Sequence, residues 1–242
     1  FNFNFSVWDW DALNQPSIAP RLMGSFSNLN SLPTRIYSMQ LVDLHDNSKL
    51  MLACDDGTVR VWRNCGLHDE YPQPELVTAF HMFTDMVPTA KGGGIVLHWN
   101  QTEQKLIASG ETRSIRLWDA VKEMKIRDYS TGTESSVTSM TSNDGNLICV
   151  GCKDGSVRVF DDRLMPQDSR VLTFYEQKSW ILDVHIYPNE GNVHILSGSL
   201  SGEIKWYDKR WPNPIKSINT GIGMTSMSVH PESDVFAWFV CL

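Results

Sequence analysis

The chain has 242 residues, of which 41% are hydrophobic and 20% charged, the composition of an ordinary globular protein. It holds no window of about 18 apolar residues, so we expect no membrane span. The formal net charge is −7 without a cluster of Lys or Arg, and we expect no nucleic-acid partner because such binding depends on a basic patch. With no secretory signal at the N-terminus and five cysteines, an odd number, we expect a cytoplasmic location and reduced thiols.

One phrase recurs along the chain, in which a turn is followed by alternating small and branched residues and then by an aromatic residue. The copies cover residues 56–62, 113–119, 154–161 and 202–208, and a degenerate copy covers residues 6–9. Asp-Gly or Ser-Gly suits the positive φ of a tight turn, and the alternation predicts a β-strand, the second arm of a hairpin. One face of these strands carries Arg60, Arg116, Arg158 and Lys205.

The spacing of the phrases predicts an all-β fold, a partial WD-repeat β-propeller over residues 1–242. The aromatic residues that end the phrases are 54, 56, 42 and 47 residues apart, from Trp8 through Trp62, Trp118 and Phe160 to Tyr207, and a four-stranded WD blade takes about 40–45 residues. No segment has the pattern of an amphipathic helix that would argue against radial repetition. We therefore expect about five of an expected seven four-stranded blades, an incomplete ring, with the phrases as the blade-closing strands.

Two segments depart from this spacing. Residues 64–94 contain Pro72, Pro74 and Pro88, and we expect an insertion that forms a long connection or an extra element at the propeller edge, with a short helix at residues 75–83. Residues 222–242 are interpreted as an incomplete last blade, because residues 225–237 are typical of a blade opening whereas residues 238–242 do not continue it.

A second pattern lies partly between the phrases and is not shared by WD repeats in general. Its main stretches are residues 7–10, 55–62, 75–80, 85–89, 99, 109–110, 115–119, 123–125, 131–132 and 154–159. In these stretches, and in their order over most of residues 7–230, the chain resembles the C-terminal propeller of the Raptor family, the regulatory-associated proteins of the target-of-rapamycin (TOR) kinase. Residues 75–89 are the most diagnostic, since many unrelated proteins carry WD phrases.

The resemblance implies a non-catalytic scaffold in a subunit of TOR complex 1 that recruits substrates to the kinase in nutrient and growth signalling. It implies protein partners, among them the TOR kinase and its complex, and a cytoplasmic location with lysosomal association through that complex. The alternative is a WD-repeat adaptor of another complex, such as a ubiquitin-ligase substrate receptor. A third interpretation is an enzyme that uses the central channel of a propeller.

No catalytic, cofactor or metal site is predicted. Cys149 and Cys152 have the CxxC spacing, but they lie in an apolar strand without a helix N-terminus that would lower a thiol pKa. Zinc would need two further ligands, so we expect buried thiols. No nucleophile, base and orienting group assemble in one identifiable place.

Five residues are candidates for protein contacts, because Trp and Arg are enriched at interface hot spots and propeller rims present them on rigid loops. They are Trp99, Arg163, Trp180, Arg210 and Trp211. The tryptophans are equally compatible with positions in the core between blades.

Overall fold

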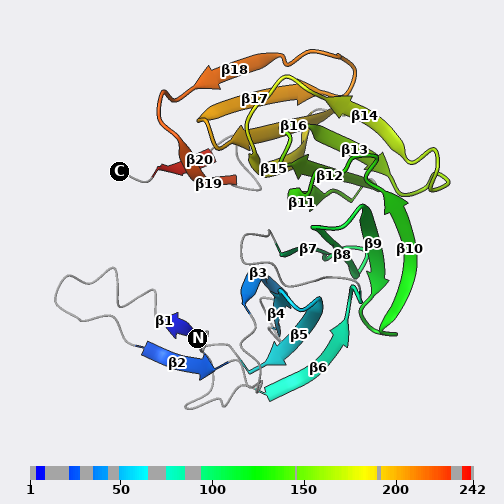
Figure 1. The fold of residues 1–242 in the computed structure, drawn as a ribbon, viewed down its shortest axis with the longest axis vertical. Coiled ribbons are helices and arrows are strands. Elements are labelled where there is room, and N and C mark those ends of the chain that lie inside the picture. The colour runs from blue at the N-terminus through cyan, green and yellow to red at the C-terminus, as the bar shows by residue number, and fades with distance from the viewer. Residues whose placement is uncertain are drawn as a thin grey trace. The chain divides into compact units, whose positions relative to one another are not determined.

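The structure, a computed structural model, describes residues 4–8, 22–27, 35–42, 49–64, 75–84, 94–144, 146–189, 192–229 and 236–240 (Figure 1). Within these ranges every regular element is a β-strand, so the described residues hold no helix that is long and apolar enough to cross a membrane. Residues 1–95 and residues 96–242 form two compact units. The predicted all-β class is confirmed, whereas a single domain over residues 1–242 stays a prediction.

The first unit contains a two-stranded and a four-stranded antiparallel sheet. β1 (Asn4–Trp8) pairs with β2 (Leu22–Ser27). The larger sheet runs in chain order through β3 (Ile36–Val42), β4 (Lys49–Cys54), β5 (Thr58–Arg63) and β6 (Glu75–His81). Leu50, Leu52 and Trp62 form a buried cluster in this unit.

The second unit holds three four-stranded antiparallel sheets and a two-stranded one, each in chain order. The first sheet is β7 (Ile95–Asn100), β8 (Lys105–Gly110), β9 (Ser114–Asp119) and β10 (Met124–Ser130). The second is β11 (Val137–Ser142), β12 (Leu147–Cys152), β13 (Val157–Asp161) and β14 (Arg170–Phe174). The third is β15 (Ile181–Asn189), β16 (Asn192–Ser199), β17 (Glu203–Asp208) and β18 (Lys216–Asn219). β19 (Met224–Val229) pairs with β20 (Phe236–Val240).

The turn that precedes the repeated strand is built as its sequence predicts. Gly57 and Gly155 have φ of 83° and 85°, and a Cβ on Gly155 would lie 2.2 Å from the backbone oxygen of Gln177. Asp154 Oδ1 accepts hydrogen bonds from Ser156 N at 2.9 Å and Ser156 Oγ at 2.6 Å. The Asp-Gly-Ser sequence thus fixes the turn and starts β13 at a defined residue.

The phrases do not form the last strands of their sheets, as we expected, but the third of four. β6, β10, β14 and β18 follow them at the sheet edges (Figure 1). An edge strand is only half covered, so its apolar pattern is weaker than that of the strands it follows. β10, for example, begins with three exposed residues, whereas all five residues of β13 are buried.

The predicted helix at residues 75–83 is wrong, because Glu75–His81 is strand β6. It pairs with β5 from Thr58 opposite His81 to Arg63 opposite Glu75, and its Val, Thr and Phe suit a strand. The interpretation that residues 238–242 do not continue the last blade is also wrong for β20, in which Trp238 pairs with Met227. Residues 65–74 and 85–93 of the expected insertion lie outside the described residues, as do residues 230–235 and 241–242.

Neighbouring sheets of the second unit bury their faces against one another. Ile115 and Tyr129 of the first sheet share a cluster with Val150 and Phe160 of the second. Val157 and Phe174 of the second sheet pack with Ile195 and Tyr207 of the third, and Leu196 and Trp206 pack with Met224 and Met227 of β19. The sheets β11–β14 and β15–β18 are therefore each covered on both faces, as propeller blades require.

Candidate protein-interaction groove

The ends of two neighbouring sheets meet at one place in the second unit. Leu147, the first residue of β12, is opposite Asp161, the last residue of β13. In the next sheet His194, near the start of β16, is opposite Asp208, the last residue of β17. The connections that follow β13 and β17 therefore lie at the same end of their sheets as the starts of β12 and β16.

A groove of about 570 Å³ opens between these two sheet ends. We call it the arginine groove. Its aliphatic lining comes from both sheets, and polar or charged residues complete it. The apolar members are Leu147, Val159, Val171, Leu172, Val193 and Ile195, and the others are Asn143, Asp161, Arg163, Lys209 and Arg210. Two of the five predicted contact residues, Arg163 and Arg210, are thus brought to one site.

Both arginines are held by the aspartate two residues earlier. Asp161 Oδ1 accepts from Arg163 N at 3.1 Å and Nε at 2.9 Å, and Oδ2 accepts from Nη2 at 2.6 Å. Asp208 repeats the arrangement with Arg210, with an Oδ1 to Nε distance of 3.0 Å and an Oδ2 to Nη2 distance of 2.5 Å. A fork of two charged hydrogen bonds fixes the plane of each guanidinium.

The aspartates lie behind the arginines, so the cations face solvent. The side chains of Asp161 and Asp208 are 11% and 4% exposed, against 65% and 55% for Arg163 and Arg210. The hydrogen bonds from Arg163 hold the pKa of the Asp161 carboxyl below its usual value, and those from Arg210 lower the pKa of Asp208 to about 2. Both Asp–Arg pairs, Asp161 with Arg163 and Asp208 with Arg210, are therefore fully ionised at neutral pH. We call these two pairs the clamps.

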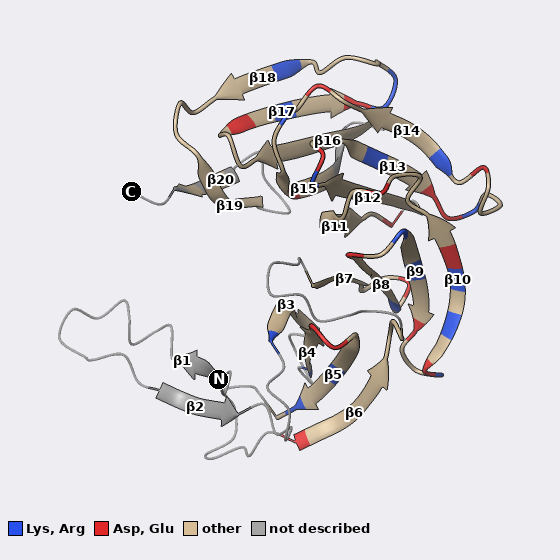
Figure 2. Cartoon of the chain, in the orientation of Figure 1, with Lys and Arg blue, Asp and Glu red and all other residues tan. Residues whose placement is uncertain are grey.

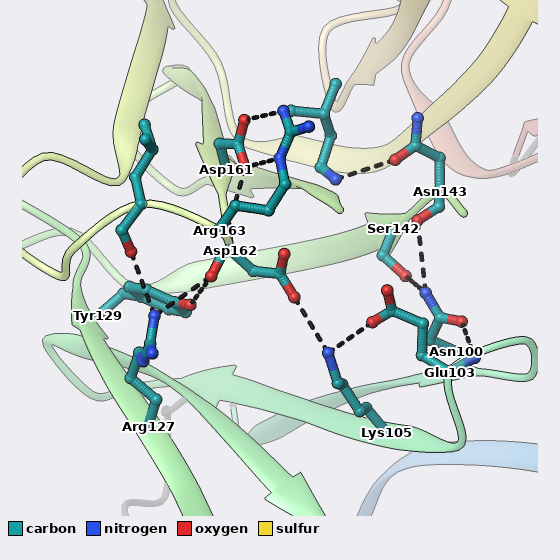
Figure 3. Close-up of polar contacts among 12 residues, drawn as sticks. Asn100, Glu103, Lys105, Arg127, Tyr129, Ser142, Asn143, Asp161, Asp162 and Arg163 are labelled. Carbon is teal, nitrogen blue, oxygen red and sulfur yellow. Dashed lines mark hydrogen bonds and ion pairs between the residues drawn. The ribbon is translucent and has the colours of Figure 1, made fainter. Parts of the chain in front are cut away.

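The turn that carries Arg163 is also tied to the neighbouring sheet β7–β10 (Figure 3). The backbone oxygen of Asp162 accepts hydrogen bonds from Tyr129 Oη at 3.1 Å and from Arg127 Nη1 at 3.2 Å. Asp162 Oδ2 lies 3.3 Å from Lys105 Nζ, which also contacts Glu103 at 2.8 Å. These contacts fix the backbone from which Arg163 extends.

Charged residues are scarce in the inner strands of the second unit, where β15 carries one, Asp183. β7, β11 and β19 carry no Lys, Arg, Asp or Glu (Figure 2). In the sheet β11–β14, the charged residues at the groove end of β13 follow its last apolar residue, Phe160. At this end the aspartates that close β13 and β17 are buried, and the arginines in the turns that follow face solvent.

The three tryptophans among the predicted residues do not join the groove. Trp211 follows Arg210 in the turn after β17 and is 61% exposed. Trp99, in β7, is partly buried, and its Nε1 donates to Gln101 Oε1 at 2.8 Å. Trp180 is 44% exposed at the opposite end of the third sheet, where Lys153 Nζ lies 4.2 Å from its ring centroid.

The other groups considered in the sequence have structural positions. Cys149 and Cys152 are buried free thiols in β12, as predicted, and burial raises the pKa of both. Among the described residues, no three His, Cys, Asp or Glu side chains converge in a way that would hold a metal ion.

The sheets and the repeated phrase define a WD-repeat β-propeller fold, which confirms the predicted fold class. The family model described as "WD domain, G-beta repeat" matches residues 28–63 and 125–161. A chain in the crystal structure of the mitotic checkpoint complex has the same fold, with a TM-score of 0.70 at 17% identity. The match covers 99% of this chain and 65% of that one.

Within that class, the chain is similar to Raptor proteins over nearly its whole length. The raptor homologue of Dictyostelium discoideum is 34% identical over 97% of this chain, and the TOR complex 1 subunit mip1 of Schizosaccharomyces pombe is 32% identical over 96%. The crystal structure of Chaetomium thermophilum Raptor superposes with a TM-score of 0.81 at 28% identity over 98% of the chain. The predicted resemblance to the Raptor family is confirmed. The chain spans 15% and 17% of the two curated relatives and 21% of the crystallised chain.

Proposed function

We propose that this chain is a non-catalytic protein-interaction scaffold within a subunit of TOR complex 1. The observation that carries the proposal is the 34% identity to a raptor homologue over 97% of the chain. A second relative, 32% identical, is named as a subunit of TOR complex 1. On this proposal the chain has protein partners that include the TOR kinase and its complex, and it acts in the cytoplasm, where its complex also brings it to lysosomes.

The arrangement of the second unit supports a binding role. Arg163 and Arg210 are exposed, yet each is fixed by a buried carboxylate, and ordered side chains lose little entropy on binding. Trp180 and Trp211 add exposed aromatic area, of the kind that anchors protein interfaces. We propose that these residues and Trp99 contact partner proteins, and that nucleic acid is not a ligand.

The test is immunoprecipitation of the full-length protein, tagged at its own gene, under gentle lysis. We expect the TOR kinase to be recovered, and we expect less of it when Arg163, Arg210 and Trp211 are replaced together by Ala. Recovery of no kinase with the unmodified protein would contradict the proposal. A matched control replaces three exposed residues of the sheet β7–β10 and its flanking turns that are not candidate contacts, Arg113, Ile126 and Glu134, and should leave recovery unchanged.

A further inference from the structure

We infer that the arginine groove binds an extended, acidic segment of a partner protein in which Asp or Glu alternates with aliphatic residues. The inference deepens the proposed function, on which it rests, by giving the partner a chemistry. It is carried by the combination, at one site, of an aliphatic floor with three cations that point to solvent, Arg163, Lys209 and Arg210.

The floor excludes a purely electrostatic ligand. Val159 and Ile195 are almost fully buried at its base, with 1% and 0% exposure, and Leu147, Leu172 and Val193 are partly exposed around them. The volume of about 570 Å³ is within the range of sites that enclose small ligands. Aliphatic side chains fit such a floor because they remove its apolar surface from water.

The cations at the rim of the groove favour a negatively charged ligand. Arg163 and Arg210 use Nε and Nη2 to hold their aspartates, and Nη1 of each makes no hydrogen bond to any described residue. Lys209 is exposed, and its side chain makes no hydrogen bond or close ion pair among the described residues, while its charge adds weakly to the field at Asp161. A carboxylate placed here gains charge-assisted hydrogen bonds to donors that are already oriented.

An extended peptide matches both parts of the site. Successive side chains of a strand point to opposite sides, so alternating residues direct aliphatic groups to the floor and carboxylates to the rim. Nucleic acid fits less well, because its binding depends on an extended basic surface. This groove has only three cations among its lining residues, and the chain as a whole has a net charge of −7.

The test is fluorescence anisotropy of the chain with a library of short peptides in which Asp or Glu alternates with Leu, Ile or Val. A second library carries Asn and Gln in place of the acids, and duplex DNA is the third probe. We expect saturable binding of acidic peptides, weakened by roughly tenfold or more by Lys209→Glu and by the neutral substitution. Lys209 belongs to neither clamp, so its replacement leaves Asp161 and Asp208 paired.

Lys178→Glu is the matched control, because Lys178 is an exposed lysine near the opposite end of the third sheet; it should change affinity by less than about twofold. Equal binding of acidic and neutral peptides, equal effects of the two lysine variants, no binding at all, or DNA binding that depends on Lys209 would each overturn the inference. If peptides fail while the kinase is still recovered in the immunoprecipitation, the groove inference falls and the proposed function stands. If peptides bind as expected but no kinase is recovered, the proposed function falls and the groove inference stands.

Discussion

Asp208 pairs with Arg210 at 2.5 Å, and we expect its contribution to stability to depend on pH. Arg210 lowers its pKa from 3.8 to about 2 in the folded chain. A carboxyl with a lowered pKa stabilises the folded state fully above its unfolded pKa, and that stabilisation is lost as the pH falls through the folded pKa. We expect Asp208→Asn to be less stable than the unmodified chain at neutral pH, with a difference that shrinks as the pH falls from about 4 toward about 2.

Urea unfolding of both proteins across this pH range measures the difference. If the free energies of unfolding of the two proteins differ by the same amount down to the lowest pH, the charge of the Asp208 carboxylate does not contribute to stability. Asp119→Asn is a useful comparison, because Asp119 ends the repeated strand β9 in the same way but accepts hydrogen bonds from the backbone of Val121 and Lys122, without an arginine two residues on.

Arg158 belongs to the polar face of the repeated strands, and the structure buries it to 3% exposure. Its Nη1 donates to Thr131 O at 2.9 Å, and its Nε donates to Ser156 Oγ at 3.1 Å. We expect Arg158→Ala to lower the free energy of unfolding by about 1.5–3 kcal/mol, as for other hydrogen bonds to charged groups. Arg113→Ala is the control, since its ion pair with Glu134 is exposed and pairs of that kind contribute about 0–1 kcal/mol.

Chemical denaturation of the two variants gives both values. A loss for Arg158→Ala no larger than for Arg113→Ala would mean that water replaces the bonds to Thr131 and Ser156 without cost.

At the level of single residues, the sequence predicted exposed arginines but not how they lie relative to one another. Arg163 and Arg210 are exposed, as predicted, but the groove that they line follows from the packing of two sheets, which no local pattern encodes. A signal was present, since Phe160-Asp161-Asp162-Arg163 and Tyr207-Asp208-Lys209-Arg210 repeat an aromatic residue, Asp, any residue and Arg. Trp180 lies at the opposite sheet ends, which only the strand topology reveals.

Among the elements, strands with a strong turn and a fully buried pattern were predictable. The third strands β5, β13 and β17 each follow an Asp-Gly or Ser-Gly turn and are nearly all buried. β6 was missed because an edge strand with residues Glu75, Leu76 and Val77 exposed carries no clear alternation. β20 was missed because its pairing with β19 depends on contacts outside the repeated phrase.

The contact between β7 and β11 includes a histidine whose pKa is lowered. His98 Nε2 accepts a hydrogen bond from Ser142 N at 3.0 Å, and burial, with a smaller effect of His185, lowers the pKa of His98 to about 4. A base whose pKa is lowered by folding is protonated first in the unfolded chain, so stability falls as the pH drops below the unfolded value of about 6.5.

We expect His98→Gln, which keeps a hydrogen-bond acceptor without a titrating ring, to lose stability less steeply than the unmodified chain between about pH 6.5 and 4. Thermal unfolding at intervals across this range measures both slopes. Identical slopes would assign the acid sensitivity to other groups.

At the scale of the whole second unit, stability comes from contacts between neighbouring sheets. Phe160 is fully buried in the cluster that joins the sheets β7–β10 and β11–β14. A separate cluster joins Leu196 and Trp206 to β19. In such an array, stability is close to a sum of repeat and nearest-neighbour terms, so a defect at one junction acts first on the sheets that share it.

We therefore expect Phe160→Ala to cost about 3–5 kcal/mol and to increase amide hydrogen exchange in both sheets that flank the cluster, and less in β19. Tyr175→Ala, which removes an aromatic ring that is 66% exposed, should change exchange only locally. Hydrogen exchange read by mass spectrometry separates the cases. Equal loss of protection from β7 through β19 would mean that the unit unfolds as one block, and loss confined to β11–β14 would mean that the junction contributes little. In cells, a nearest-neighbour response lowers the abundance of the protein without selectively removing one partner, which distinguishes Phe160→Ala from replacements in the arginine groove.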